Sequence, residues 1–176
     1  MKKTSNSQLN RITVQEFKET PKSPLVVVLD NIRSQSNTGS FFRTCDAFRV
    51  GQLFLCGITA TPPHREIEKT ALGATQSVDW EYHEHTTNCI SKLKQQGFYI
   101  IVIEQAEPKM FLGTFSFEKE KKIALVFGNE INGVDEKVMA MADACVEIPQ
   151  LGTKHSLNVA VSAGIVLWEF SKSQFN

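Results

Sequence analysis

Three short polar segments hold the side chains of this chain that are best suited to chemistry. They are Asn37-x-Gly39-x-x-x-Arg43, Gly128-Asn129-Glu130 and Gly152-x-x-x-Ser156-Leu157-Asn158. Together they offer a guanidinium, a carboxylate, a hydroxyl and several amides, which are groups that bind polar ligands and stabilise developing charge.

Each of these segments follows an apolar run that predicts a buried strand. The runs are Val26–Asp30, Ile123–Phe127 and Ala144–Ile148. In an open parallel sheet, the loops after the carboxyl ends of the strands lie at one edge, where ligands bind. We therefore expect the three segments, although far apart in sequence, to meet in one pocket.

Arg43 lies on a predicted helix whose other side chains are largely apolar, and burial of an unpaired guanidinium is costly. It must therefore reach solvent, a ligand or a local carboxylate such as Asp46. Asn37 and Gly39 are expected to shape the turn before that helix. Glu130 is expected near the carboxyl edge, where it could hold Arg43 in one rotamer.

Two further glycine and serine positions have both a structural and a functional interpretation. Gly128 would let a ligand approach the backbone closely, although Gly128-Asn129-Glu130 is also a common turn sequence. Ser156 is expected to be the N-cap of the last helix, with Asn158 in its first turn. His155, like His83-x-His85, is more typical of the surface than of a catalytic or metal site.

The composition bounds the class of protein. The chain has 176 residues, which suits one compact domain, and its 19 Lys and Arg residues balance 19 Asp and Glu residues. Positive charge for a nucleic acid must therefore be local or assembled by a dimer. Four cysteines match no zinc spacing, so no metal site is expected, and three of them lie in apolar contexts and are interpreted as reduced core thiols. The four are Cys45, Cys56, Cys89 and Cys145.

The N-terminal residues 1–24 differ from the rest of the chain. They are polar and form a short basic arm, in which Thr13-x-x-Glu16 predicts a capping box and a short helix. The arm is either a solvated surface helix or an RNA-contacting extension. No apolar segment follows Lys2 and Lys3, and no run is long enough to cross a membrane, so we expect a cytoplasmic protein with no membrane partner.

From Leu25 onward, strand and helix patterns alternate, which predicts an α/β fold with a mostly parallel sheet and helices on both faces. Besides the three strands above, we expect strands at Leu53–Ile58, Val78–Tyr82 and Phe98–Ile103. Helices are expected at Thr38–Phe48, Arg65–Gly73, Asn88–Gln96, Asp135–Met141 and Ser156–Phe170. The segment Glu104–Lys122 is ambiguous and is expected to form a loop or a turn of helix.

The last predicted helix has two apolar stripes, whereas a helix covering one sheet face needs one. The first stripe comprises Leu157, Val161, Ile165 and Trp168, and the second comprises Val159, Val166 and Phe170. Two stripes predict burial on two sides, either at a subunit interface or deep within one protomer.

Taken together, these residues resemble the SpoU family of RNA ribose 2′-O-methyltransferases, within the SPOUT class, over about residues 25–170. The first family motif resembles Asp30-Asn31-Ile32 through Asn37-Thr38-Gly39 to Arg43. The second is similar to Ile123–Phe127 followed by Gly128-Asn129-Glu130-Ile131-Asn132-Gly133. The third and most specific resembles Val146-Glu147-Ile148-Pro149-Gln150-Leu151-Gly152 followed by Ser156-Leu157-Asn158-Val159-Ala160-Val161-Ser162.

The resemblance implies a methyltransferase domain over residues 25–176, a homodimer, and a C-terminal trefoil knot that binds S-adenosylmethionine. It implies that the cofactor lies against Gly128, Ile148 and Leu157, under the loop after Ile103 near Glu104. It implies a catalytic set of Arg43, Asn37, Glu130, Ser156 and Asn158.

The chemistry of the implied reaction limits the role of Arg43. A guanidinium holds its proton too firmly to act as a base. We expect Arg43 instead to bind the adjacent phosphate bidentately and to stabilise the developing alkoxide. Water or a substrate phosphate oxygen could take the proton.

Similarity to one branch of the family favours tRNA over rRNA, and guanosine 18 of the D-loop within tRNA. The similar segments are Lys69-Thr70-Ala71-Leu72-Gly73-Ala74, Glu104-Gln105, Glu147–Asn158 and Leu167-Trp168-Glu169-Phe170. The alternatives are methylation of rRNA or of the tRNA wobble position, and a non-catalytic knotted RNA-binding protein. Without Gly-x-Gly-x-x-Gly or Gly-Lys-Ser/Thr, a dinucleotide-dependent dehydrogenase and a P-loop protein are disfavoured.

Overall fold

A single parallel sheet organises the chain. The structure is a computed structural model that describes residues 1, 3–5, 8–9, 11–118 and 120–175. Within them, neighbouring strands are all parallel and follow the order β3-β2-β1-β6-β4-β7-β5. The strands are β1 (Leu25–Asp30), β2 (Gln52–Cys56), β3 (Trp80–His83), β4 (Tyr99–Ile103), β5 (Met110–Phe111), β6 (Ile123–Phe127) and β7 (Ala144–Glu147).

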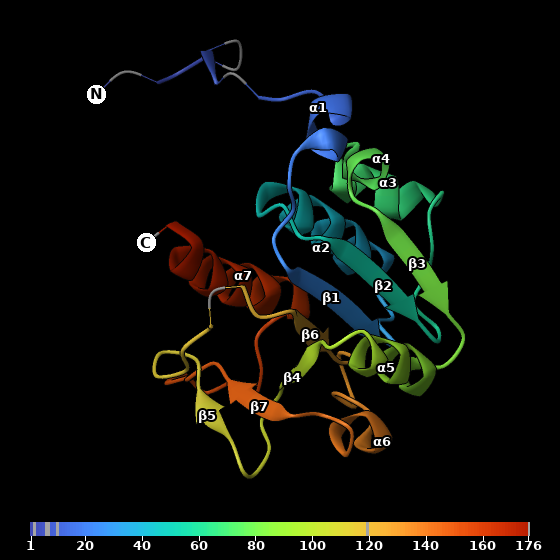
Figure 1. Cartoon of the computed structure of the whole chain (residues 1–176), viewed down its shortest axis with the longest axis vertical. Coiled ribbons are helices and arrows are strands. Elements are labelled where there is room, and N and C mark those ends of the chain that lie inside the picture. The colour runs from blue at the N-terminus through green and yellow to red at the C-terminus, as the bar shows by residue number, and fades with distance from the viewer. Residues whose placement is uncertain (2, 6–7, 10, 119, 176) are drawn as a thin grey trace.

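Helices cover both faces of this sheet (Figure 1). They are α1 (Val14–Glu19), α2 (Gln35–Ala47), α3 (Arg65–Ala71), α4 (Ala74–Ser77), α5 (Thr86–Gln95), α6 (Glu136–Met139) and α7 (Val159–Phe175). Side chains of α2, α3, α4 and α7 belong to one hydrophobic core, and those of α5 and α6 belong to a second. The α/β fold with helices on both faces is therefore confirmed.

Strand β1 shows why its sequence is apolar from Leu25 to Leu29. All six of its residues are buried. Val27 and Leu29 belong to the core beneath α2 and α7, whereas Val26 and Val28 belong to the core beneath α5. Because side chains alternate between the two faces of a strand, a strand covered on both faces needs a continuous apolar run.

Helix α2 begins three residues before the predicted start. Ser34 is its N-cap and accepts a hydrogen bond from the backbone N–H of Asn37. Asn37 and Gly39 therefore lie inside the helix, and the prediction that they shape a preceding turn is wrong. Gly39 is required by packing, because a Cβ there would collide with Thr70 and Ile67 of α3.

Helix α7 begins three residues later than predicted, at Val159. The side-chain oxygen of Asn158 accepts hydrogen bonds from the N–H groups of Ala160 and Val161. Asn158 therefore caps this helix, and the prediction that Ser156 is its N-cap is wrong. An amide oxygen satisfies the free N–H groups of a first turn as well as a serine hydroxyl does.

The remaining differences lie at the ends of helices and strands and in the ambiguous segment. The helix predicted over Arg65–Gly73 ends at Ala71, because Leu72 and Gly73 both have positive φ, and a short α4 follows. Within Glu104–Lys122, the two-residue strand β5 adds to the edge of the sheet beside β7.

The N-terminal segment is anchored to the domain. Thr13 and Glu16 form the predicted capping box of α1, which is confirmed. Phe17 is only 4% exposed and belongs to the larger core. Lys2, which the basic arm included, lies outside the described residues.

Candidate functional site

A pocket of about 490 Å³ lies at the carboxyl edge of the sheet. The loops that follow β4, β6 and β7 line it, as expected where parallel strands end together. The expected residues that line it are Ile103, Glu104, Gly128, Glu130, Ile148, Ser156, Leu157 and Asn158. The structure thus brings together all five residues expected at a cofactor and three of those expected to assist catalysis.

A chain of hydrogen bonds connects all three polar segments. The Asn158 Nδ2 donates to Asn37 Oδ1 at 3.1 Å, and the Asn37 Nδ2 donates to Glu130 Oε1 at 2.9 Å. Asn37 thereby joins this pocket's polar wall from the first turn of α2. The three side chains fix one another, and each comes from a different loop or helix end.

The Glu130 carboxylate also binds the backbone at the start of α2. It accepts hydrogen bonds from the backbone N–H groups of Arg33 at 2.9 Å and Ser34 at 3.0 Å. Partial burial opposes its ionisation, but the hydrogen bonds from Arg33, Asn37 and Ser34 outweigh burial, so the pKa of Glu130 lies below its usual value. These are its partners, and the prediction that Glu130 holds Arg43 is wrong.

Glu104 fixes the loop that follows β4 against the loop that follows β6. Its Oε1 accepts from the N–H of Gln105 at 2.8 Å, and its Oε2 accepts from the N–H of Val134 at 3.1 Å. Gln105 in turn donates to the backbone oxygen of His155 at 2.7 Å. The three pocket loops are therefore joined to one another by direct hydrogen bonds.

The structure gives a reason, not visible in the sequence, why residue 128 is a glycine. A Cβ at this position would collide with the backbone of Gly133 and Val134. The loop after β6 folds back on itself, with paired backbone hydrogen bonds between Asn129 and Gly133. Gly128 lines the pocket, and its missing side chain is required by this loop, so the expectation that it lets a ligand approach the backbone stays a prediction.

Asn129 has a positioning role that sequence reasoning missed. Its Nδ2 donates to the backbone oxygen of Asn31 at 2.7 Å, which ties the loop after β6 to the loop after β1. Its Oδ1 accepts from the N–H groups of Ile131 and Asn132. An asparagine directly after a strand, beside Gly and before Asn-Gly, is the signal that could have found it.

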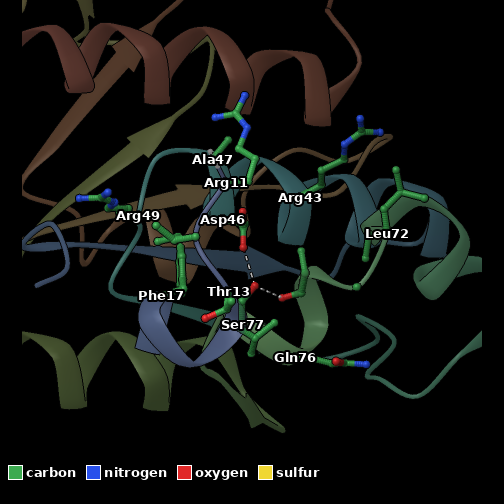
Figure 2. Close-up of a pocket in the computed structure, with 15 residues that line it drawn as sticks. Arg11, Thr13, Phe17, Arg43, Asp46, Ala47, Arg49, Leu72, Gln76 and Ser77 are labelled. Atoms are coloured by element: carbon green, nitrogen blue, oxygen red, sulfur yellow. Dashed lines mark hydrogen bonds between the residues drawn. The ribbon is translucent and has the colours of Figure 1, made fainter. Parts of the chain in front are cut away.

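Arg43 does not line this pocket. It lies six residues beyond Asn37, which is about 9 Å along α2 at the rise of an α-helix, and it lines a second cavity of about 570 Å³. Figure 2 shows Arg43 there with Arg11, Arg49 and Leu72. Within one protomer, the expectation that all three segments share one pocket is therefore wrong for Arg43.

Asp46 also lines the cavity that contains Arg43, but it does not neutralise the Arg43 guanidinium. Its carboxylate accepts a hydrogen bond from the hydroxyl of Ser77, shown as a dashed line in Figure 2. No ion pair joins Arg43 to any of the residues that the structure describes. Arg43 is exposed, so its guanidinium is available to a partner or ligand.

The two apolar stripes of α7 have different environments. Val166 and Phe170 are buried against the sheet. Val161, Ile165 and Trp168 are 51%, 38% and 55% exposed. The alternative that the whole helix is buried within the protomer is therefore wrong, and an apolar face remains uncovered.

The described part of the chain offers little else that resembles a functional centre. The four cysteines are buried free thiols, and His83 pairs with Glu81 at 3.0 Å. Among the described residues, no three His, Cys, Asp or Glu side chains are grouped as metal ligands. No helix in that part is long and apolar enough to cross a membrane.

A parallel α/β domain with a polar pocket built from its carboxyl-edge loops defines the class of protein. Residues 24–168 match the SpoU rRNA Methylase family, which covers well over half of the chain. The chain belongs to this family, and the resemblance inferred from its motifs is confirmed.

Known relatives and structures agree with this assignment. A tRNA (guanosine(18)-2′-O)-methyltransferase of Aquifex aeolicus is 32% identical over 165 residues, which are 92% of this chain and 75% of the relative. A 23S rRNA (guanosine-2′-O-)-methyltransferase of Neisseria meningitidis is 30% identical over 83% of this chain and 57% of the relative. The AdoMet-bound rRNA methyltransferase of Sinorhizobium meliloti superposes with a TM-score of 0.80 at 26% identity, over 89% of this chain and 59% of that one.

Proposed function

We propose that this protein transfers a methyl group from S-adenosylmethionine to a ribose 2′-hydroxyl of RNA. The single observation that carries the proposal is the hydrogen-bonded chain Asn158–Asn37–Glu130 at the wall of the carboxyl-edge pocket. It joins the three family motifs in space, inside a chain that belongs to a methylase family.

The pocket fits the proposed cofactor. Its volume of about 490 Å³ is in the usual range for small-molecule sites. Ile103, Ile148 and Leu157 offer apolar surface for a purine ring, and Glu104 gives the wall negative charge beside them. When bound, S-adenosylmethionine supplies an electrophilic methyl group attached to a sulfonium.

The residues of the chain position the substrate and stabilise charge. We assign to Asn37, Glu130, Ser156 and Asn158 the orientation of the ribose and its phosphate, because positioning supplies much of the rate of a transfer between two bound groups. Arg43 binds the adjacent phosphate bidentately and stabilises the developing alkoxide. The hydroxyl proton passes to water or a phosphate oxygen, because a guanidinium does not accept it.

A homodimer would reconcile this role with the location of Arg43 outside the pocket. The uncovered face of Val161, Ile165 and Trp168 on α7 is the surface that a second copy would cover. Arg43 lies on α2, which packs against α7, so the same interface would present Arg43 to the pocket of the partner. In this proposal each active site takes its arginine from one protomer and its cofactor from the other.

The substrate we favour is tRNA, with guanosine 18 as the target nucleotide. The Aquifex relative named for guanosine 18 aligns over 75% of its length, whereas the Neisseria relative named for 23S rRNA aligns over 57%. Methylation of rRNA or of the tRNA wobble position, and RNA binding without catalysis, are the alternatives that the experiment below distinguishes.

The domain organisation belongs to the same proposal. Residues 25–176 would form the methyltransferase domain with a C-terminal trefoil knot, and residues 1–24 would form the basic arm. Hydrogen bonding between Gln105 and the His155 backbone, which joins the loop after β4 to the loop before α7, supports a tightly interlocked C-terminal region. Tracing residues 100–176 in a crystal structure tests the knot. The buried free thiols support a reducing, cytoplasmic setting.

Methyl transfer from tritiated S-adenosylmethionine tests the function directly. The purified chain is offered an unmodified tRNA transcript, the same transcript with 2′-deoxyguanosine at position 18, and a 23S rRNA transcript. We expect label only in the first. Label in rRNA or at the wobble nucleotide would support those alternatives, and binding of RNA without label in any of them would support the non-catalytic one.

Arg43 is tested by single-turnover methylation with S-adenosylmethionine binding measured alongside. Arg43→Ala should lose methyl transfer and keep cofactor binding, and Arg43→Lys should remain poor because it lacks the planar fork. Near-normal transfer by Arg43→Ala would remove Arg43 from the mechanism.

A further inference from the structure

The cavity that contains Arg43 also holds positive charge, from two further arginines, that the proposed reaction does not use. Three arginines line it, Arg11, Arg43 and Arg49, against one carboxylate, Asp46. Asp46 is hydrogen-bonded to Ser77 on the cavity floor. Figure 2 shows the guanidinium groups of Arg11 and Arg43 beyond Asp46 from Ser77, and that of Arg49 to one side of Asp46. None of the three forms an ion pair with a residue that the structure describes.

This concentration of charge contrasts with the rest of the chain. The net charge is zero over 176 residues. Binding of a polyanion depends on how many phosphates local cations neutralise, and not on the charge of the whole protein. An open cavity of about 570 Å³ with three unpaired guanidinium groups is therefore the part of this protomer best suited to a phosphate backbone.

Two residues at the edge of the cavity occupy unusual backbone conformations. Arg49 follows the C-cap of α2 with a φ of 50°, and Leu72 follows α3 with a φ of 50°. Positions just after a helix that adopt this left-handed conformation strongly favour glycine. A residue other than glycine is costly at such a position, which favours a use of its side chain. Both side chains are exposed at the same cavity, and Leu72 is 66% exposed.

The N-terminal segment brings the third arginine to this place. Phe17 anchors α1 in the core, and Thr13 caps α1. Arg11 precedes that cap by two residues and lines the cavity beside α2 and α4. The basic arm thus completes the wall of a pocket instead of only extending into solvent.

We propose that Arg11 and Arg49 bind phosphates of the substrate RNA next to the nucleotide whose phosphate Arg43 holds, with Leu72 contacting an adjacent sugar. This inference rests on the proposed function, because it takes Arg43 as the point where the RNA enters the reaction site. In this proposal, the cavity is a groove that binds the RNA strand and fixes its register.

The sharpest test is Arg49→Gly in the full chain. Glycine removes the guanidinium and is favoured at a φ of 50°, so the melting temperature should stay the same or rise. The Kd for an unmodified tRNA transcript, measured by fluorescence anisotropy without cofactor, should rise about three- to tenfold near 0.1 M salt. The slope of log Kd against log salt should fall by about 1. Arg49→Lys should retain most of the affinity.

Arg11→Ala provides a second variant that leaves the helices untouched, and the same loss of affinity and slope is expected. Lys137→Ala is the matched control, because Lys137 is an exposed cation on α6, which packs on the other face of the sheet. Its Kd should match that of the wild type.

Wild-type affinity and slope in both arginine variants would overturn the inference, as would a wild-type chain that binds no RNA. A lower melting temperature of Arg49→Gly with an unchanged Kd would show a structural role and would also overturn it. Methyl transfer to the same transcript is measured separately, so the methyltransferase proposal can survive or fail independently of the arginines.

Discussion

Asn158 and Asn37 are 121 positions apart in sequence, and their side-chain amides are joined by a hydrogen bond of 3.1 Å. Asn158 also caps α7 with its Oδ1, through the N–H groups of Ala160 and Val161. One side chain therefore fixes the start of a helix and connects it to the polar wall of the pocket. The two roles use different atoms, so they can be separated by substitution.

Asn158→Asp should keep the cap and lose the connection. A carboxylate accepts from the first-turn N–H groups and interacts favourably with the helix dipole, but it has no N–H to donate to Asn37. We expect the free energy of unfolding in urea to stay within about 0.5 kcal/mol of the wild type, and single-turnover methylation to fall about 10- to 100-fold. Asn158→Ala should lose both functions, with about 1 kcal/mol of stability. Equal activity of Asn158→Asp and the wild type would contradict the assignment.

Glu130→Gln should change the pH dependence of stability. The pKa of Glu130 lies below its usual value of 4.5 in the folded chain because the hydrogen bonds from Arg33, Asn37 and Ser34 outweigh the effect of burial. Its ionised form therefore stabilises the fold above pH 4.5, and this contribution disappears as the pH falls through the folded-state pKa.

The measurement is the free energy of unfolding between about pH 3 and pH 8. Glu130→Gln should be less stable than the wild type near pH 7, and the difference should shrink toward pH 3. Glu84→Gln is the control, because Glu84 is exposed and makes no hydrogen bond or ion pair with the described residues. A difference for Glu130→Gln that stays constant with pH would contradict the role of its charge.

Gly39→Ala should destabilise the packing of α2 on α3. The added Cβ would collide with the backbone of Ile67 and the side chain of Thr70, and backbone cannot move aside cheaply. Overpacking of this kind costs about 1–3 kcal/mol, which calorimetry would detect as a lower melting temperature. Gly113→Ala is the matched control, since no heavy atom lies within 4 Å of the added Cβ. An unchanged melting temperature for Gly39→Ala would show that the two helices can separate freely.

Heterodimers test whether Arg43 acts in the pocket of the partner. Arg43→Ala and Asn158→Asp chains with different affinity tags are co-expressed, and the mixed dimer is isolated. If Arg43 acts across the interface, the mixed dimer has one intact site of two and should show about half of the wild-type rate. If Arg43 acts in its own protomer, neither site is intact and the mixed dimer should be no more active than the Asn158→Asp homodimer. Each homodimeric variant, carried through the same tags and purification, provides the control.

The sequence alone determined the layers of the fold and the identity of several pocket residues. A continuous apolar run such as that of β1 has few structural outcomes, because a strand buried on both faces requires it. Residues in the loops that follow such strands, including Glu130 and Asn158, are then confined to one edge of the sheet. Local signals were equally decisive for the capping box of Thr13 and Glu16, which uses atoms three residues apart.

Only the tertiary structure decided where the helices begin and which cavity each functional side chain reaches. Helix α2 begins early because the Glu130 carboxylate accepts hydrogen bonds from the N–H groups of Arg33 and Ser34. Glu130 is almost a hundred positions away in sequence. Arg43 lies in a different cavity from Asn37 because six residues of helix separate them by about 9 Å. Residue 128 is a glycine because a Cβ there would collide with the backbone of Gly133. These facts depend on contacts between distant segments, and no local pattern of residues contains them.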